Sequence, residues 1–80
     1  MAVYQPGDHI KVEFKDDGTG ESEWMWVQVE SSDDENRMIF GRLDSEPILH
    51  ASLKVGQELA VSYDKIRDHR RFDQPQTSLQ

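Results

Sequence analysis

The sequence predicts a mainly β protein, either a small antiparallel barrel or a strongly bent sheet of four to five strands, with little helix. Several short segments alternate apolar with polar residues, as half-buried strands do. Polar turns separate these segments, and only the short segment Ile48–Leu53 is a candidate for a helical turn, with a loop as the alternative. A barrel would also remove the exposed strand edges that a flat sheet offers to other chains.

The first predicted strand is His9–Lys15, which follows a Pro-Gly-Asp turn signal at residues 6–8. Side chains two residues apart in a strand point to the same face. Ile10, Val12 and Phe14 therefore share one face, and we expect that face to be buried.

The second predicted strand, Trp24–Glu30, follows a charged loop at residues 16–22 whose two glycines tolerate positive φ, as a hairpin requires. Alternation places Met25, Val27 and Val29 on the core face.

Both tryptophans, Trp24 and Trp26, fall on the opposite face of this strand. Two readings remain open for them. They form a binding surface, or at least one is buried, with Trp26 lying under the segment 47–53 or against Phe72.

The third predicted strand is Arg37–Leu43, after a polar turn at residues 31–36. Gly41 inside it indicates a bulge or a close approach of two backbones, because glycine otherwise weakens a strand. Two phases stay open here: either Met38 and Phe40, or Ile39 and Leu43, face the core. A bulge at Gly41 would let members of both sets pack inward.

After a turn at residues 54–57, Glu58–Tyr63 alternates again, with its odd-numbered residues inward. A short coda, Asp64–Asp68, is expected to place Ile66 over the core. We assign residues 1–72 to a single domain and residues 73–80, which are polar and nonperiodic, to a disordered tail.

Composition limits the functions that this chain of 80 residues can carry. Cysteine is absent, which excludes disulfides and thiolate metal sites. The formal net charge is −7, and residues 1–36 hold ten acids against two lysines. Such a surface repels nucleic-acid phosphates. No apolar run is long enough to cross a membrane and no signal-peptide pattern begins the chain, so we expect a cytoplasmic protein.

The order of short motifs from residue 23 to residue 68 resembles a known family. The motifs are E-x-M-W-V-x-V from Glu23, G-R-L-D-x-x-P from Gly41 and L-K-x-G-x-x-L-x-V from Leu53, preceded by G-D-x-I-K-V from Gly7. This pattern is similar to the bacterial family called domain of unknown function 2314. One departure is Ser45, where the family pattern has asparagine, and another is the charged loop after the first strand. The resemblance implies a compact Src-homology-3-like barrel and no catalytic residues.

The candidates for chemistry are weak. The three histidines, His9, His50 and His69, stand singly without ligand spacing, so we predict no metal and no cofactor. The serines lack a nucleophile motif, and adjacent acids in solvated loops do no acid–base work. We expect that the protein is not an enzyme.

We predict a non-catalytic acidic protein-interaction module that acts on a basic partner, as an inhibitor, an immunity-type protein or a phage counter-defence protein that mimics DNA. Aromatic residues at interface centres and acidic rims suit such a partner. The predicted contact residues are Trp24, Trp26, Glu21, Glu23, Glu30, Asp33, Asp34 and Glu35. The alternative is a small barrel that binds nucleic acid through the basic run Lys65–Arg71, and a second alternative is an uncharacterised housekeeping domain.

Overall fold

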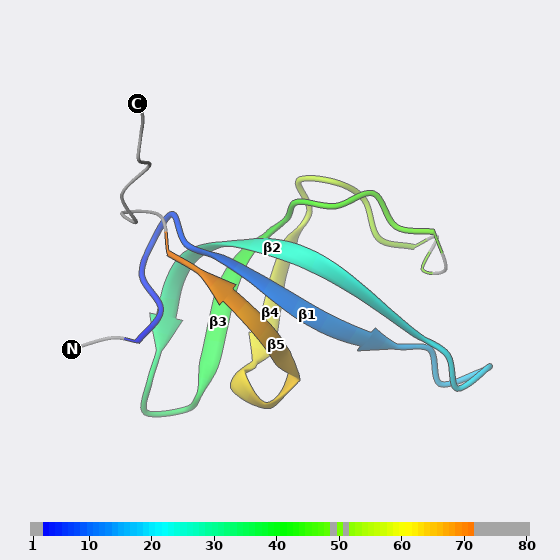
Figure 1. Ribbon diagram of the computed structural model, residues 1–80, viewed down its shortest axis with the longest axis horizontal. Helices are drawn as coiled ribbons and strands as arrows, with labels where there is room; N and C mark the ends of the chain where they lie inside the picture. The colour runs from blue at the N-terminus through cyan, green and yellow to red at the C-terminus, as the bar shows by residue number, and fades with distance from the viewer. Residues whose placement is uncertain (1–2, 49, 51, 72–80) are drawn as a thin grey trace.

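Five antiparallel strands form one sheet in the computed structural model, which describes residues 3–48, 50 and 52–71 (Figure 1). The strands are β1 (His9–Lys15), β2 (Ser22–Asp33), β3 (Met38–Leu43), β4 (Glu58–Ser62) and β5 (Ile66–Arg70), with a single 3₁₀ turn, η1 (Tyr63–Lys65), before β5. Their order across the sheet is β4-β3-β2-β1-β5. The mainly β class is confirmed, and the described residues contain no α-helix.

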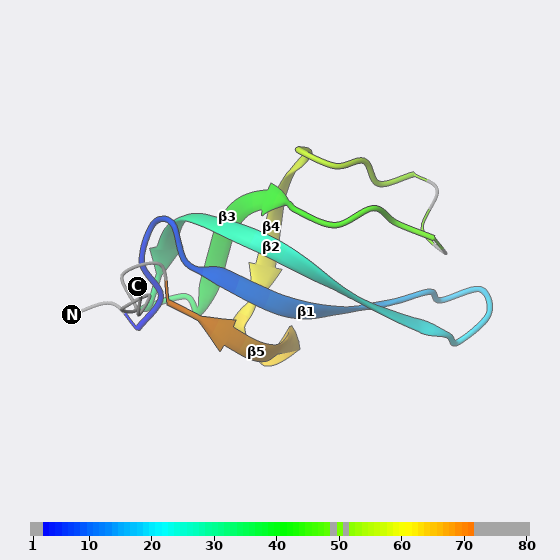
Figure 2. The same ribbon diagram turned by 45° about the horizontal axis from the view of Figure 1, so that its top comes forward.

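The sheet is open within the described residues. β4 and β5 form its opposite edges, and no ladder joins them. Only the three residues of η1 separate these edge strands in the chain, so the sheet edges approach each other at that end. Figure 2 shows the β1–β2 hairpin and the loop after β3 extending from the same side of the sheet.

The observed strand bounds are close to those predicted from the alternation of apolar and polar residues. β1 has the predicted bounds, β3 begins one residue later and β4 ends one residue earlier than expected. β2 is longer at both ends because Ser22 pairs with Lys15 of β1 and Asp33 pairs with Met38 of β3. Cross-strand pairing thus extends β2 into polar residues that alternation alone excludes.

The segment after Asp64 differs from its prediction, because it forms a fifth strand, β5. The segment after Asp64 was expected only to place Ile66 over the core, whereas Ile66–Arg70 forms an edge strand that pairs with β1. Ile66 is partly buried against the core, as expected. A strand with one apolar residue carries no alternation signal, so the partner strand decides its conformation.

The core lies on the inner face of the sheet. Among the described residues, its buried apolar members are Ile10, Val12, Met25, Val27, Val29, Ile39, Leu43 and Val61. The predicted inward sets of β1, β2 and β4 are confirmed. In β3, Ile39 and Leu43 face inward, whereas Phe40 is 43% exposed.

Gly41 confirms both a close approach and an adjacent bulge. A Cβ atom at this position would lie 2.2 Å from the carbonyl oxygen of Gln28, so no other residue fits without moving β2. The bulge is in β2, where the register shifts between Val29 and Ser31. Glu30 is the extra residue of this bulge. Glu30 and Ser31, although consecutive, can therefore both point away from the buried face.

Some predictions fall on residues that the structure does not describe. Phe72 and the predicted tail, residues 73–80, lie outside the described residues. The described part of the segment 48–53 forms turn and loop rather than helix. No helix within the described residues is long and apolar enough to span a membrane.

Candidate functional site

The two tryptophans of β2 have different environments on the outer face of the sheet. Trp24 is 56% exposed and lies directly across from Glu13 of β1. Trp26 is half-buried, with the Lys11 ammonium and the Arg70 guanidinium each 5.2 Å from its ring centroid. Neither tryptophan belongs to the core, and Trp26 is covered by cations of its own chain.

The backbone of Trp26 is held by the loop that follows β3. Its N–H donates to the Ser45 hydroxyl oxygen at 2.8 Å, and its carbonyl oxygen accepts the Asp44 N–H at 2.8 Å. Ser45, where the sequence pattern led us to expect asparagine, therefore supplies a side-chain acceptor for the Trp26 N–H.

The predicted acidic contact residues do not form one patch. Glu21 is exposed in the β1–β2 loop, whereas Asp33, Asp34 and Glu35 lie at the other end of β2. Figure 1 shows these two ends far apart, on the right and at the lower left. A partner would have to contact the length of β2 to meet both groups.

Two of the acids at the β2–β3 turn have structural partners. The Asp33 carboxylate accepts from the side chain of Asn36 at 2.8 Å and from its backbone N–H at 3.2 Å, and these bonds lower the pKa of Asp33. Asp34 accepts a hydrogen bond from the Tyr63 hydroxyl, and burial, then this bond, raises the pKa of Tyr63. Asp34 and Glu35 are both exposed, and the Glu35 side chain has no hydrogen bond to another described residue.

Glu23 lies on the inner face, away from the two tryptophans. Its carboxylate accepts from the backbone N–H groups of Ile48 at 2.6 Å and His50 at 3.3 Å, and contacts the His50 ring nitrogen Nδ1 at 3.1 Å. The Glu23 side chain is 11% exposed. It therefore holds the loop after β3 rather than rimming an aromatic surface.

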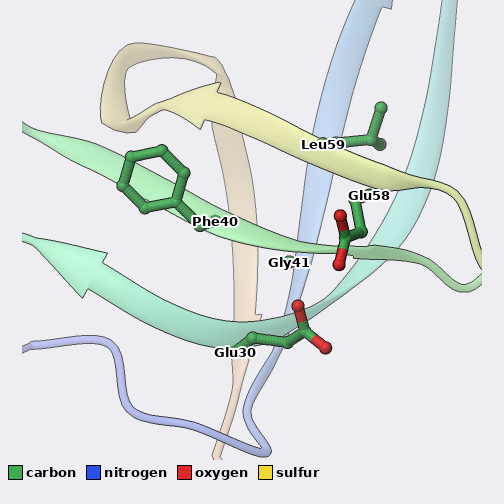
Figure 3. Close-up of a pocket in the computed structure, with 5 residues that line it drawn as sticks. All are labelled: Glu30, Phe40, Gly41, Glu58 and Leu59. Atoms are coloured by element: carbon green, nitrogen blue, oxygen red, sulfur yellow. The ribbon is translucent and has the colours of Figure 1, made fainter.

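Glu30 lines a shallow groove of about 280 Å³ on the sheet, together with Phe40, Gly41, Glu58 and Leu59. Figure 3 shows the Glu30 and Glu58 carboxylates on either side of Gly41, the Phe40 ring farther along β3, and the Leu59 side chain turned away.

Arg42 joins the two carboxylates beside this groove. Its Nε donates to Glu30 at 2.7 Å and its Nη2 to Glu58 at 3.2 Å, while Nη1 reaches the carbonyl oxygen of Gly56 at 3.3 Å. The hydrogen bond that Arg42 donates to Glu30, followed by the charges of Glu30 and Glu58, raises the pKa of Arg42. The arrangement fixes the spacing of the carboxylates and leaves one net negative charge.

The basic run is partly engaged within the domain. Arg67 donates to the Glu13 carboxylate through Nε at 2.9 Å, and its Nη2 forms an ion pair with the same oxygen at 2.8 Å. The hydrogen bond from Ser22, and next the one from Arg67, lowers the pKa of Glu13. Arg70 lies over Trp26. The positive charge of this run is therefore distributed over β1 and β2.

Sequence reasoning missed that each histidine meets a carboxylate. His69 contacts Asp8 at 2.7 Å and packs against Tyr4 with the rings tilted by 55° and their centroids 4.7 Å apart, while His9 contacts Asp44 at 2.9 Å. Asp8 is 3% exposed.

Alternation along the strands could have predicted that two of these acids point inward. Asp8 precedes the core residue Ile10 by two positions, and Glu23 precedes the core residue Met25 by two, so each shares the face of its core neighbour. These pairs do not gather into a metal site, since no group of three potential ligands occurs in the described chain.

Comparison with known proteins gives one family. The family model described as "Uncharacterized protein conserved in bacteria (DUF2314)" matches residues 5–78, nearly the whole chain. No curated protein and no solved structure matches the chain.

Proposed function

The chain belongs to the bacterial DUF2314 family, and we propose that it acts as a non-catalytic, cytoplasmic protein-interaction module that binds a basic surface of another protein. The family match confirms the resemblance seen in the sequence. Inhibition of the partner, as by an immunity-type or counter-defence protein, is the role that we favour for this binding.

The observation that carries the proposal is the exposure of Trp24. Its side chain is 56% exposed on the outer face of β2, three residues from the exposed acid Glu21. Exposed tryptophan is costly to hydrate and is enriched among the residues that dominate binding energy in protein interfaces. Trp24 is thus the apolar contact of the proposed interface.

The disposition of charge supports a basic partner. Three arginines, Arg37, Arg42 and Arg67, pair with carboxylates of the chain, and the formal net charge remains −7. Exposed acids such as Glu21 and Glu35 then set the sign of the field at the surface. A negative field speeds encounter with a positive surface, and salt screens this effect.

The proposal includes the fold type. We place the sheet among Src-homology-3-like barrels that are incompletely closed, because β4 and β5 form opposite edges yet are separated only by η1. A groove of about 490 Å³ lies between β1 and β4, which face each other without pairing.

Nucleic-acid binding is the second candidate, and one observation favours it. Lys11 and Arg70 both lie against Trp26, which combines an aromatic ring with two cations on the outer face. Aromatic rings beside cations bind single strands by stacking and phosphate attraction. The net charge of −7 opposes this function.

The test begins with capture of the partner from a bacterial lysate on the immobilised protein and its identification by mass spectrometry. Association and dissociation rates are then measured with the purified partner. Trp24→Ala is expected to speed dissociation at least tenfold, about 1.4 kcal/mol, with little change in the association rate.

The electrostatic part of the test uses Glu21→Lys with Glu35→Lys. Each reversal adds two charges, so the formal net charge changes from −7 to −3. Association should slow several-fold in dilute buffer and match the native rate at high salt. Native kinetics in both variants, or capture of nucleic acid in place of a basic protein, would contradict the proposal.

A further inference from the structure

We propose that the groove lined by Glu30, Phe40, Gly41, Glu58 and Leu59 accepts a lysine side chain of the partner protein. This inference rests on the proposed function, because it assigns a position on the domain to the basic partner. Hereafter these five residues are called the β3 groove.

The exposed ring of Phe40 is the first feature that points to this occupant. Phe40 lies on the outer face of β3 and is 43% exposed, although every other apolar residue of β3 is half-buried or buried. An aromatic face attracts an ammonium group within about 6 Å of its centroid. It also packs against the aliphatic stem of a lysine, which carries four methylene groups.

The second feature is the position of the two carboxylates. Glu30 and Glu58 come from the two strands that flank β3, and Figure 3 shows them on either side of Gly41. Arg42 engages the Oε2 atom of each, and within the described residues the Oε1 atoms have no hydrogen-bond partner. An incoming ammonium group can therefore be paired without displacing Arg42.

The backbone explains why these groups are fixed in place. The bulge at Glu30 and the close approach of β2 to Gly41 set the position of one carboxylate relative to β3. Arg42 connects Glu30 to Glu58, and its contact with the carbonyl oxygen of Gly56 holds the guanidinium toward the loop before β4. Fixed groups lose less conformational entropy when a ligand binds.

Size and charge together select a lysine side chain over other occupants. A volume of about 280 Å³ holds one long side chain and not a folded segment. The triad of Glu30, Glu58 and Arg42 carries one net negative charge, which complements a single ammonium group. A wholly apolar side chain would leave the carboxylates uncompensated.

The test uses two blocked peptides as probes, acetyl-Gly-Lys-Gly-amide and its norleucine analogue, which has the same stem length without the ammonium group. Backbone amide shifts of the ¹⁵N-labelled full chain are followed in dilute buffer. The lysine peptide should shift the amides of Phe40, Gly41 and Leu59 with saturation, and the norleucine peptide should shift them at least threefold less.

Three variants separate the sources of binding. Phe40→Leu keeps an apolar side chain and removes the aromatic face, while Glu58→Gln removes one charge, and each should weaken lysine-peptide binding at least threefold. Glu46→Gln removes another exposed charge, outside the β3 groove, and should leave binding unchanged. The unfolding midpoint of each variant is measured in parallel, so that a loss of fold is not counted as a loss of binding.

Three outcomes would overturn the inference: equal shifts from the norleucine peptide, shifts spread over the acidic loops without saturation, or native binding by Phe40→Leu and Glu58→Gln. If these occur while the partner still depends on Trp24 and on salt, the groove assignment fails and the proposed function stands. If the lysine peptide binds as expected and the partner ignores Trp24 and salt, the proposed function fails by itself.

Discussion

Gly41 shows how a single residue sets the geometry of the sheet and of the β3 groove. The backbone of β2 passes so close that a Cβ atom at position 41 would lie 2.2 Å from the Gln28 carbonyl oxygen. This oxygen belongs to a backbone, which cannot rotate away as a flexible side chain can. The glycine is therefore required by a tertiary contact.

Gly41→Ala should lower the free energy of unfolding by about 3 kcal/mol, because the added methyl group forces β2 and β3 apart. Urea denaturation followed by tryptophan fluorescence measures this change. Gly18→Ala is the control, since its Cβ atom would meet only the Asp16 side chain, at 3.3 Å. A loss of less than about 1 kcal/mol in Gly41→Ala would show that the two strands separate easily.

Position relative to the strand also decides what individual acids do. Glu21 lies in the loop before β2 and is exposed, whereas Glu23, two residues later and inside β2, turns inward and accepts from the loop backbone. Residues 23, 25, 27 and 29 share the buried face, so this inward position follows from alternation. The high density of acids in residues 1–36 hides this alternation in the sequence.

At the scale of elements, the loop between β3 and β4 depends on contacts with β2. Glu23 holds the backbone of Ile48 and His50, and Ser45 accepts from the Trp26 N–H. The loop has no helix or strand of its own within its described residues. Its conformation is therefore set by a few hydrogen bonds that cross from another element.

Glu23→Gln should loosen this loop and lower the free energy of unfolding by about 1–2 kcal/mol, because charge-assisted hydrogen bonds are replaced by weaker neutral ones. Hydrogen exchange at the Ile48 and His50 amides should accelerate about tenfold. Glu21→Gln, two residues away and exposed, is the matched control. Unchanged exchange at both amides would mean that the loop is held by other contacts.

β5 illustrates why the sequence predicts strands but not their order in the sheet. Its sequence, IRDHR, has one apolar residue, and its pairing with β1 involves a register shift between Lys11 and Val12. Alternation identifies strands that bury one face, and an edge strand with polar side chains has little to bury. Only the docking of η1 and β5 against β1 shows that a fifth strand exists.

At the scale of the whole molecule, acid should destabilise the domain through carboxylates that are paired in the folded state. The pKa of Glu13 is lowered by its hydrogen bonds to Ser22 and Arg67, and that of Asp33 by its bonds to Asn36. A folded-state pKa below the unfolded value stabilises the fold above the unfolded pKa. This stability is lost as the pH falls through the lowered folded-state pKa.

The free energy of unfolding of the native chain should therefore exceed that of Glu13→Gln at pH 7, and the difference should shrink as the pH falls below the ordinary value of 4.5. Urea titrations at pH 7, 5, 4 and 3 measure it. Glu35→Gln, in an exposed turn position, is the comparison and should show a small difference at every pH. A Glu13→Gln difference that is constant with pH would exclude this linkage.

The sequence by itself determined the mainly β class, the approximate bounds of four strands, the inward faces of β1, β2 and β4, and a bulge or close backbone approach at Gly41. These features follow from period-two alternation and from backbone sterics, which act over a few residues.

The tertiary structure alone decided the phase of β3, the pairing of β5 with β1, the loop backbone as the partner of Glu23, and the separation of the predicted acids between the two ends of β2. It also placed Lys11 and Arg70 over Trp26 while leaving Trp24 exposed. Each of these depends on strand order and register, which bring together residues distant in the chain, so that no local pattern encodes them.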